Sequence, residues 1–492
     1  MTQDTITTQL YINGLARAAS DGGTYPLHNP ARPSELVGHV AAGTERDAED
    51  AVQAAHRAFP AWSALSYAER AAQLNRVADL LVGDEAEVEA RSRLFTREHG
   101  KIRRETLLEI TRLGDRFRQT AAYAERLALD ETLPGPPFDA IITRQPRGVA
   151  VLVVPWNWPL AILGAKLPQA LMAGNTVVVK PSENAALATT LTLHMIAAAL
   201  PAGVVNIVTG DSARIGDRLT GHPLTRFVNF TGSVAIGRHV MKVAAENLTP
   251  VTLELGGNDP GIVLKDAVLD EAAFNRLYMG AFMSTGQICM ALKRLYVHRS
   301  RYDEVVAGIT AVAARQVVGD GLLTETTMGP LNNPKQLGVV RGMIAEALAA
   351  GADVQEFGRV PDVDLYQAGY FQRPTFVLNA DPQLRVVREE QFGPVLPIMA
   401  FDSEAEVIAV ANNSEFGLCS SIWTADRDRA VAMARQLEAG FTYLNAHGPT
   451  AQDGRSPFGG FKNSGIGRNM GYEGVIQFQG HHAISGPAGW LL

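Results

Sequence analysis

The spacing of hydrophobic residues changes several times along the chain. Between residues 8 and 40, short hydrophobic runs alternate with Gly and Pro turns such as Asn13-Gly14, a pattern that predicts short strands and loops. Hydrophobic residues then recur three and four positions apart, as in Leu74, Val77 and Leu81, which is the period of an amphipathic helix. On this basis we predict helices over residues 45–59, 68–82 and 105–127.

From Gly148 onward the chain repeats a unit of β-rich hydrophobic run, turn and helix. Continuous hydrophobic strands that alternate with helical segments are typical of a parallel sheet covered on both faces. The sequence therefore predicts a doubly wound α/β domain with strands at residues 149–154, 176–179, 204–208 and 227–230. After Gly257 a second α/β series is expected, with candidate strands at residues 261–264, 294–297 and 420–422.

Two segments stand outside these units. The Pro-rich patch Leu133-Pro-Gly-Pro-Pro-Phe138 ends the helical block, and residues 140–147 beyond it are expected to form an extended arm. The tail, residues 474–492, is interpreted as a strand followed by an irregular end.

Composition narrows the possible partners. The chain has 492 residues, of which 46% are hydrophobic, and this is enough for two or three domains with complete cores. The net charge of -7 is mild, and no Lys/Arg cluster forms a stripe that could follow a phosphate backbone. Nucleic acid and an anionic membrane surface are therefore not expected as partners, and small-molecule chemistry is favoured.

Membrane insertion and secretion are not expected either. The most hydrophobic window, residues 148–165, is interrupted by Pro155, Asn157 and Pro159, so it is interpreted as strand, loop and helix. The N-terminus has acidic and polar residues where a signal peptide has a basic start and a hydrophobic run.

The two cysteines, Cys289 and Cys419, are too few for a disulfide framework, and no CxxC or HxxxH spacing offers a metal site. A cytoplasmic location is expected from this cysteine usage.

Cys289 follows the turn-prone run Ser284-Thr285-Gly286, which could present a thiol at the mouth of a cleft. A nucleophilic role would require a helix N-terminus, nearby dipoles or a base to lower its pKa from roughly 8.5. A small buried core residue is the alternative, and it is the interpretation favoured for Cys419.

Two strand ends have features that suit a nucleotide. Phe230-Thr-Gly-Ser-Val-Ala-Ile-Gly237 follows a strand and opens a predicted helix, so its backbone N–H groups could approach a phosphate. A plain tight turn explains this run equally well, and Arg238-His239 stands where a P-loop would need Lys-Ser/Thr. Lys180 and Glu183 end another strand, where an acid can bind ribose hydroxyls and repel a 2′-phosphate. A solvated ion pair is the alternative.

Two further polar residues lie in unusual surroundings. Asn157 is held between two prolines and two tryptophans in Pro155-Trp-Asn-Trp-Pro159, so its amide could donate to a developing oxyanion. Glu254 stands in the hydrophobic run Leu253-Glu-Leu-Gly-Gly257, where burial would raise its pKa toward the range of a general base. Core tryptophans and a buried salt bridge are the respective alternatives.

Together and in this order, these features resemble the NAD(P)-dependent aldehyde dehydrogenase superfamily, of the hydrolytic, non-acylating type. The resemblance covers nearly the whole chain. It rests on the joint occurrence, at family-like spacing, of PWNWP, NTVVVKPSE, FTGSVAIG, LELGGNDP, FMSTGQIC, EEQFGPV and SPFGGFK.

The resemblance implies a covalent mechanism. Cys289 would attack the aldehyde carbon to give a thiohemiacetal, whose oxyanion the Asn157 amide and the Cys289 backbone N–H would hold. Hydride would pass to the nicotinamide, and water activated by Glu254 would hydrolyse the resulting thioester to the acid. The resemblance also places Lys166 in the catalytic set.

The same resemblance assigns binding residues. NAD is expected as the cofactor in preference to NADP, because of Glu183. The expected cofactor residues are Pro155, Trp156, Lys180, Ser182, Glu183, Gly210, Phe230, Thr231, Gly232, Ser233, Ile236, Leu255, Gly256, Glu390 and Phe392. The expected lining of the substrate tunnel is Trp158, Ile162, Ala165, Ile288 and Met290.

Two positions depart from the pattern of the family. Ala165 stands where many relatives have a bulky Trp and succinate-semialdehyde enzymes have an Arg. This argues against a short dicarboxylic semialdehyde and favours a neutral aromatic or longer-chain aldehyde. Asn469 stands where many hydrolytic relatives have a Glu in a proton relay with the lysine at position 166, so the relay is expected to differ.

The resemblance implies two doubly wound α/β domains plus a small β oligomerisation arm. The dinucleotide-binding domain is expected to comprise residues 1–127 and 147–255, and the catalytic domain residues 256–447. Residues 128–146 and 448–492 are assigned to the oligomerisation arm and tail, so a homodimer or homotetramer is expected.

Two alternatives stay open on sequence alone. A coenzyme A-acylating semialdehyde dehydrogenase shares the fold, but such relatives lack a base at the position of Glu254. A catalytically silent structural or binding protein on the same fold would not need Cys289, Glu254 and Asn157 together.

Overall fold

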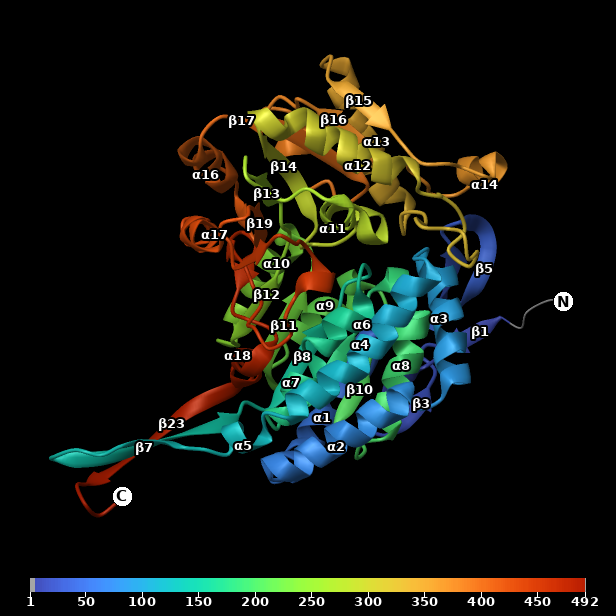
Figure 1. Cartoon of the computed structure of the whole chain (residues 1–492). Coiled ribbons are helices and arrows are strands. Elements are labelled where there is room, and N and C mark those ends of the chain that lie inside the picture. The colour runs from blue at the N-terminus through green and yellow to red at the C-terminus, as the bar shows by residue number, and fades with distance from the viewer. Residues whose placement is uncertain (1–4, 492) are drawn as a thin grey trace.

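Two sheets of mostly parallel strands form the two lobes of the chain, in a computed structural model that describes residues 5–491 (Figure 1). The first lobe is built mainly from the N-terminal half of the chain, with a short strand and helix from residues 465–476, and the second lobe from residues beyond Gly257. A narrow arm extends from the first lobe and contains the last strand of the described chain. The two doubly wound domains and the β arm predicted from the sequence are confirmed at this level.

The first sheet has the strand order β22-β12-β11-β8-β9-β10-β2-β3, and β12, β11, β8, β9 and β10 run parallel. The order reverses between β8 and β11, and ligands of such sheets bind at the carboxyl ends of strands at this point. The strands are β2 (Leu10–Ile12), β3 (Leu15–Arg17), β8 (Val149–Val153), β9 (Thr176–Lys180), β10 (Val205–Ile207), β11 (Thr225–Thr231), β12 (Val251–Glu254) and β22 (Gly465–Ile466). All four strands predicted for this lobe are therefore confirmed.

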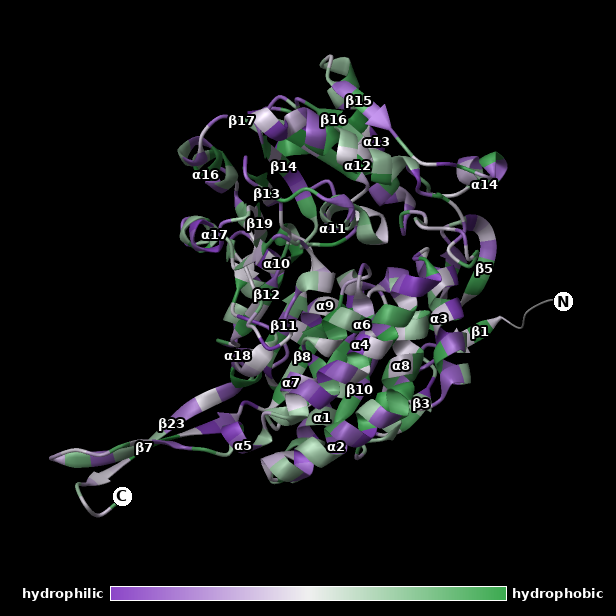
Figure 2. Cartoon of the chain, viewed as in Figure 1, coloured by the Kyte–Doolittle hydropathy of each residue, from purple (hydrophilic) through white to green (hydrophobic). Residues whose placement is uncertain are grey.

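Helices cover both faces of this sheet. They are α1 (Glu45–Ser63), α2 (Tyr67–Val82), α3 (Glu85–His99), α4 (Arg103–Ala121), α5 (Ala124–Leu127), α6 (Pro159–Gly164), α7 (Leu167–Met172), α8 (Leu187–Ala198), α9 (Ser212–Thr220), α10 (Val234–Ala245) and α18 (Gly471–Ile476). Figure 2 shows hydrophilic and hydrophobic positions mixed along α2 and α4, and the buried residues of α2 recur three and four positions apart. The three predicted helices are confirmed, although the third is interrupted before α5.

Helix α3 was not predicted, because its buried face is largely polar. Arg91, Glu98 and His99 are all buried on it, so the hydrophobic spacing that marks the neighbouring helices is weak here. The carboxylate of Glu98 accepts hydrogen bonds from the N–H groups of Leu187 and Ala188, each at 2.7 Å. A buried acid therefore caps the start of α8, and a buried polar contact of this kind leaves no trace in the hydrophobic periodicity of the sequence.

The second sheet has the strand order β15-β16-β17-β14-β13-β19-β20. Its strands are β13 (Asp259–Val263), β14 (Leu292–His298), β15 (Asp353–Glu356), β16 (Thr375–Leu378), β17 (Val395–Phe401), β19 (Cys419–Trp423) and β20 (Phe441–Leu444). The covering helices are α11 (Glu271–Phe282), α12 (Tyr302–Ala314), α13 (Pro334–Ala349), α14 (Val363–Ala368), α15 (Arg385–Arg388), α16 (Glu404–Asn412) and α17 (Arg427–Ala434). The three predicted strands of this series correspond to β13, β14 and β19.

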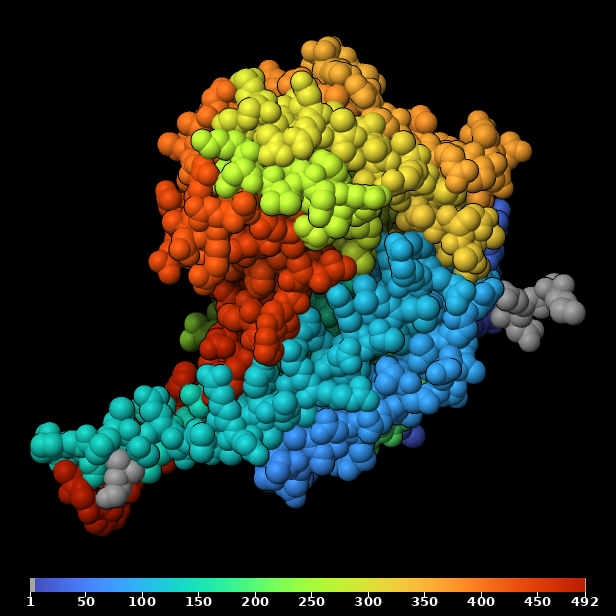
Figure 3. Space-filling model, in the orientation of Figure 1, coloured from blue at the N-terminus to red at the C-terminus, as the bar shows by residue number. Residues whose placement is uncertain are grey.

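The arm pairs two segments that are distant in sequence. β7 (Phe138–Pro146) lies between β6 (Glu131–Leu133) and β23 (Gln479–Pro487), and it pairs antiparallel with β23 along its whole length. Figure 3 shows that the arm projects from the body. The prediction of an extended arm is confirmed. The tail begins differently from the prediction, because its first residues are the last turn of α18 and the strand starts at Gln479.

Smaller elements complete the described chain. They are β1 (Ile6–Thr8), β4 (Thr24–Asn29) and β5 (Arg32–Ala41) in one sheet, β18 (Phe416–Gly417) paired with β21 (Phe461–Lys462), and the 3-10 segments η1 (Glu183–Ala185), η2 (Met283–Gly286), η3 (Arg299–Arg301) and η4 (Pro449–Ala451). The short strands predicted between residues 8 and 40 are confirmed. Across residues 5–491, none of the helices has the length and hydrophobicity needed to cross a membrane.

Candidate active site

Cys289 lies on a turn that follows α11 and the short segment η2. Ser284 and Thr285 in η2 have φ values of 51° and 58°, a left-handed conformation that these residue types rarely adopt. Contacts from other elements hold this backbone in place. A carboxylate oxygen of Glu105 in α4 accepts the Ser284 N–H at 2.8 Å, and the Thr285 hydroxyl donates to the Gly329 carbonyl at 3.0 Å. The sequence around the cysteine thus folds into a strained turn that its surroundings fix.

Two cavities meet at Cys289. One, of about 260 Å³, opens at the carboxyl ends of β8, β11 and β12, and the other, of about 80 Å³, lies against α4 and α6. Asn157, Thr231 and Cys289 line both cavities. The thiol is therefore placed where two ligands could meet, which a structural core cysteine does not require.

The first cavity contains much of the predicted cofactor set. The expected residues that line it are Pro155, Trp156, Thr231, Gly232, Ser233, Leu255, Gly256, Glu390 and Phe392. Gln336 and Val339 of α13 also line it and were not predicted. The hydroxyl of Ser233 accepts the Ile236 N–H at the start of α10, so the free N–H groups of this helix end lie beside the cavity.

The remaining predicted cofactor residues lie along the same edge of the sheet, outside the cavity lining. Lys180 at the end of β9 forms an ion pair with Glu183 at 3.1 Å. Glu183 also accepts the N–H and the hydroxyl of Ser212, at 2.6 and 2.8 Å. Ile236 is 51% exposed on the first turn of α10. The others in this group are Ser182, which caps η1, Gly210, which follows β10, and Phe230, whose ring lies against Gly232.

The residues of this edge fit a dinucleotide. The α10 N-terminus offers N–H donors for phosphate. Glu183 lies beyond the end of β9, and Glu390 reaches the cavity from the second lobe. Both carboxylates can accept ribose hydroxyls. Glu390 is held by the Gly257 N–H at 3.2 Å and by Lys293 at 3.3 Å. Trp156 and Phe392 meet edge to face with centroids 5.5 Å apart, which gives the cavity aromatic walls.

Glu254 lies at the end of β12 and lines the second cavity together with Cys289. Burial raises the pKa of its carboxyl to about 8, although the positive charges of Lys166 and Arg468 oppose this shift. Its Oε1 atom is buried and has no hydrogen-bond partner within residues 5–491. A carboxyl with these properties can exchange a proton near neutral pH and has a free oxygen to accept one.

The thiol of Cys289 is a weak acid in this setting. Burial and then the negative charge of Glu254 raise its pKa well above the ordinary range of a cysteine, and Lys293 opposes this only in part. Lys293 donates to the carbonyls of Ile288 and Cys289, each at 2.7 Å, so its charge is partly engaged by the backbone. The resting thiol is therefore protonated and requires a base, for which Glu254 is placed in the same cavity.

Asn157 is buried and lines both cavities. Its Nδ2 donates to the Gln287 carbonyl at 2.9 Å, which fixes the amide beside the turn that contains the cysteine. An NH₂ group has two donors, so one N–H remains for an oxygen atom in the cavity. This arrangement supports the predicted oxyanion interaction, which stays a prediction.

Lys166 is fully buried in a chain of amide groups. Its Nζ donates to Oδ1 of Asn229, and Nδ2 of Asn229 donates to Oδ1 of Asn469 at 2.7 Å. Burial lowers the pKa of Lys166 to about 7, against the negative charges of Glu254 and Cys289, which raise it. Lys166 and Asn469 are thus connected through Asn229, which sequence reasoning did not identify. An amide at 469 cannot take up a proton as a carboxylate would.

The second cavity is lined by all five residues predicted for the substrate tunnel, namely Trp158, Ile162, Ala165, Ile288 and Met290. It also has lining residues that were not predicted, namely Arg112, Arg116, Ala161, Pro449, Gln452, Phe458, Asn469 and Met470. Five of these, from Pro449 to Met470, come from the segment that we grouped with the arm and tail, so part of that segment lines the cavity that contains the cysteine. Their contribution depends on tertiary contacts that no local pattern marks.

One face of α4 was missed as a functional surface. Glu105, Glu109, Arg112 and Arg116 are spaced by four, three and four residues, so they share a face of the helix. Glu105 holds the cysteine turn, Glu109 accepts N–H groups at the start of α6, and the two arginines line the second cavity. In the sequence this face is marked only by a row of charges with helical period, which hydrophobic periodicity does not reveal.

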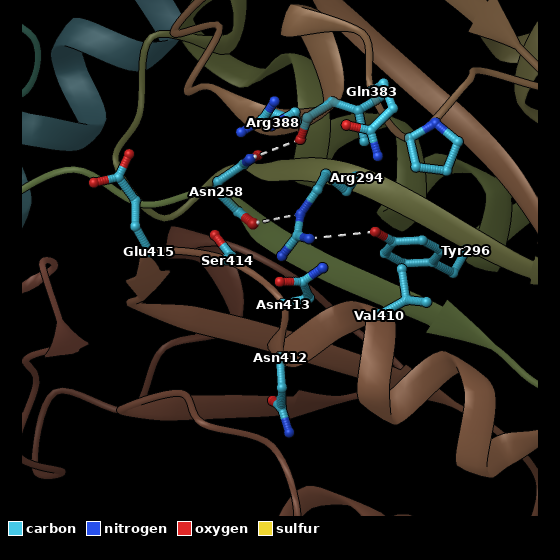
Figure 4. A pocket seen from close by; sticks show the side chains of 12 residues that line it. Asn258, Arg294, Tyr296, Gln383, Arg388, Val410, Asn412, Asn413, Ser414 and Glu415 are labelled. Carbon is cyan, nitrogen blue, oxygen red and sulfur yellow. Dashed lines mark hydrogen bonds between the residues drawn. The ribbon is translucent and has the colours of Figure 1, made fainter.

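A larger cavity of about 520 Å³ lies in the second lobe (Figure 4). Amide, guanidinium and hydroxyl groups make up most of its polar lining, and Arg294 donates to the Asn258 carbonyl at 2.8 Å and to the Tyr296 hydroxyl at 3.2 Å. Its lining does not place a nucleophile beside a base. We therefore do not assign the active site to this cavity, although it is larger than the two cavities at Cys289. Over residues 5–491 no group of three His, Cys, Asp or Glu side chains is arranged to hold a metal ion.

Comparisons with known proteins agree with this geometry. The model of the aldehyde dehydrogenase family matches residues 17–484. The chain is 37% identical to a glutarate-semialdehyde dehydrogenase of Pseudomonas putida, over 96% of each chain. It is also 37% identical to an NADP-dependent succinate-semialdehyde dehydrogenase of Escherichia coli, over 96% of each chain. A crystal structure of betaine aldehyde dehydrogenase from Staphylococcus aureus with NAD⁺ superposes with a TM-score of 0.91 at 31% identity, covering 99% of this chain and 95% of that one.

Proposed function

This chain belongs to the aldehyde dehydrogenase family, and we propose that it oxidises an aldehyde to the carboxylic acid with NAD as the electron acceptor. The observation that carries the proposal is the meeting of two cavities at Cys289, one of which is also lined by Glu254, a carboxyl group of pKa about 8. One cavity fits the cofactor and the other the aldehyde. Neither a silent scaffold nor a binding module requires this combination.

The first step is attack of the Cys289 sulfur on the aldehyde carbon. The Glu254 carboxylate takes the thiol proton, a carbon–sulfur bond forms, and the carbonyl oxygen becomes an oxyanion. The second N–H of the Asn157 amide and the Cys289 backbone N–H stabilise this oxyanion. The proton on Glu254 then leaves to solvent, which the pKa of about 8 allows near neutral pH.

When bound, NAD supplies the acceptor for the hydride that leaves the thiohemiacetal carbon. Pro155, Trp156 and Phe392 would form the walls around the nicotinamide end, and Gly232 and Ser233 would lie beside the phosphates. Loss of the hydride restores the carbonyl group and leaves a thioester on Cys289.

Hydrolysis of the thioester regenerates the enzyme. Glu254 accepts a proton from water, the hydroxyl oxygen attacks the thioester carbon, and the carbon–sulfur bond breaks to release the acid. The Cys289 sulfur recovers its proton from Glu254. The positive charge of Lys166 lowers the pKa of Glu254, so it keeps part of the carboxyl ionised as a base.

The test of the function is NAD reduction by the purified protein with a panel of aldehydes, in the absence of coenzyme A. We expect turnover without coenzyme A, because the buried carboxyl of Glu254 provides a base for hydrolysis. Turnover that requires coenzyme A would instead identify an acyl-transferring enzyme. No NAD reduction with any aldehyde would overturn the proposal.

Cofactor choice provides a second test. Replacing Glu183 with serine should raise the ratio of kcat/KM for NADP over NAD by roughly tenfold, because the variant removes a negative charge that would repel a 2′-phosphate. Glu246→Ser, at the far end of α10, is the matched control and should leave the ratio unchanged. If Glu183→Ser does not favour NADP, the residue does not select the cofactor.

We propose that the body of the substrate is a longer carbon chain or an aromatic group. Ala165 leaves room in the cavity, and Trp158, Ile162, Met290 and Phe458 supply an apolar lining. The two relatives named for glutarate semialdehyde and succinate semialdehyde indicate that this family also includes enzymes whose substrates have a carboxylate at the far end.

We also propose that the arm assembles the chain into a homodimer or homotetramer. Exposed hydrophobic residues lie on or beside the arm, and such residues suit burial against another subunit. They are Leu133, Phe138, Ile484 and Trp490.

The location follows from the chemistry of the cysteines. Both cysteines are free thiols, and the mechanism needs Cys289 reduced, so we propose a reducing compartment such as the cytoplasm.

A further inference from the structure

Arg112 and Arg116 bring two positive charges to the substrate cavity. They stand on successive turns of α4, and both line the cavity that contains Cys289, Glu254 and Asn157. Each side chain is partly buried. Neither residue has a role in the chemical steps proposed above, so their presence in this lining requires another explanation.

Neither arginine forms an ion pair with an acid. Within residues 5–491, no carboxylate lies within ion-pair distance of either guanidinium. Arg112 Nη1 donates to the Pro449 carbonyl at 3.1 Å, and Arg116 Nη1 donates to Oε1 of Gln119 at 2.7 Å, so both partners are neutral. Arg118 on the same helix, by contrast, forms an ion pair with Asp79 at 2.8 Å.

The two charges are also close enough to affect each other. Burial lowers the pKa of both guanidinium groups, and the charge of Arg112 lowers the pKa of Arg116 further. Nearby acids, namely Glu109, Asp115 and Asp453, offset these shifts only in part. Partly desolvated like charges without a directly paired counterion are unfavourable. An anion that enters the cavity would relieve this, and each guanidinium has donors left to bind it.

The loop opposite α4 is shaped around Arg116. A Cβ atom at Gly454 would lie 1.3 Å from Arg116 Nη1, so the backbone approaches the guanidinium as closely as only glycine permits. Asp453, the neighbouring acid, bonds instead to Arg455, whose Nη2 donates to it at 2.6 Å. The structure therefore holds the Arg116 charge in place, while the nearest acid of this loop pairs directly with Arg455 and acts on Arg116 only through space.

We infer that Arg112 and Arg116 form an anion subsite in the substrate cavity, and that the substrate is an aldehyde with a carboxylate at the end away from the carbonyl. This inference rests on the proposed function and names its substrate class. It replaces the expectation of a neutral aldehyde, which depended on the alanine at position 165 alone. The apolar part of the lining suits the carbon chain that joins the two ends.

The test compares aldehydes matched in length. kcat/KM would be measured for pentanal and 5-oxopentanoate, and for hexanal and 6-oxohexanoate, with the wild type and the double variant Arg112→Gln/Arg116→Gln. We expect the wild type to prefer the acids by at least about tenfold, and the double variant to lose this preference by about 10- to 100-fold, mainly through KM.

Three further variants separate charge from structure. Arg118→Gln removes a charge from the same helix outside the cavity and should leave the preference unchanged. Arg116→Lys keeps the charge and should retain part of the preference. Gly454→Ala should displace the Arg116 guanidinium and lower the preference without removing any charge.

A binding measurement makes the inference independent of turnover. Titration calorimetry with glutarate should detect binding to the wild type and at least about tenfold weaker binding to the double variant. Glutarate binding that is equal in both proteins, or a wild type that uses pentanal as well as 5-oxopentanoate, would overturn the subsite and leave the proposed function standing. Failure of every aldehyde to reduce NAD would overturn the proposed function, while glutarate binding would still support the subsite.

Discussion

Replacing Cys289 with alanine should lower NAD-dependent aldehyde oxidation by at least about 10³-fold, because no other group in the cavity lining can form the covalent intermediate. The Asn157 amide and the cofactor groove would remain, so NAD should still bind with unchanged affinity. Initial rates of NADH formation and NAD titration by intrinsic fluorescence measure the two quantities separately. Loss of activity together with retained NAD binding identifies a chemical role for the thiol.

The second cysteine provides the matched control. Cys419 lies on β19, is 1% exposed, and packs in the hydrophobic cluster behind the site without lining either cavity. Cys419→Ala should retain activity within about threefold, with a lower thermal unfolding midpoint because it leaves a small cavity. Activity that survives in Cys289→Ala, or disappears equally in Cys419→Ala, would remove the basis for assigning the nucleophile.

Alkylation distinguishes the two thiols without substrate. Limited treatment with iodoacetamide, followed by peptide mass spectrometry, should modify Cys289 in preference to Cys419, because the cavities reach only Cys289. The rate should rise as the pH is raised, since burial and the Glu254 charge keep the thiol protonated near neutral pH. A resistant Cys289 would match the core interpretation that the sequence left open.

The sheets were predictable because their strands are buried on both faces. β8, β9 and β11 are continuous hydrophobic runs, and this is a local property that the sequence displays directly. Helix α3 was not predictable in this way, because Arg91, Glu98 and His99 occupy its buried face and form hydrogen bonds with other parts of the chain. Hydrophobic periodicity describes packing against a core, and it does not describe buried polar networks.

The residues of the candidate site differ in the same way, because some lie in local sequence motifs and others are brought to the site only by packing. Cys289, Glu254 and Asn157 lie in compact motifs at strand ends or turns, and a resemblance carried by such motifs located them. Arg112 and Arg116 lie within a long amphipathic helix, and only the packing of α4 against the second cavity brings them to the substrate. Substrate selection is therefore less visible in the sequence than the chemistry, because helix faces and loops distant in sequence determine it.

Position 469 departs from the pattern of the family, and its tertiary contacts change how this departure is interpreted. The sequence showed only that a carboxylate is absent there. The structure shows that Asn469 accepts a hydrogen bond from Asn229, which in turn binds the buried Lys166. The asparagine at position 469 is thus part of a continuous network of amide groups. Lys166, whose pKa is about 7, is the group of this network that can exchange a proton.

Replacing Glu254 with glutamine should lower steady-state turnover by about 10²- to 10⁴-fold, because the variant lacks the base that activates water. The first half of the reaction should be less affected at alkaline pH. Burial and the Glu254 charge both raise the pKa of the Cys289 thiol, so removal of the charge lowers that pKa part of the way, and hydroxide can take the thiol proton at alkaline pH. The expected result at about pH 9 is a burst of NADH close to one per active site, followed by slow turnover.

The accumulated species should be an acyl group on Cys289, detectable as a mass increase of the peptide that contains it.

In the wild type, kcat should rise as the pH rises toward and through about 8, because the carboxylate form of Glu254 then becomes the major one. In Glu254→Gln this rise should be absent. Glu415→Gln, which lines the cavity of the second lobe, is the matched control and should keep the wild-type profile. A Glu254→Gln variant with normal turnover and an unchanged pH profile would show that another group activates the water, and the buried Lys166 network would then be the next place to look.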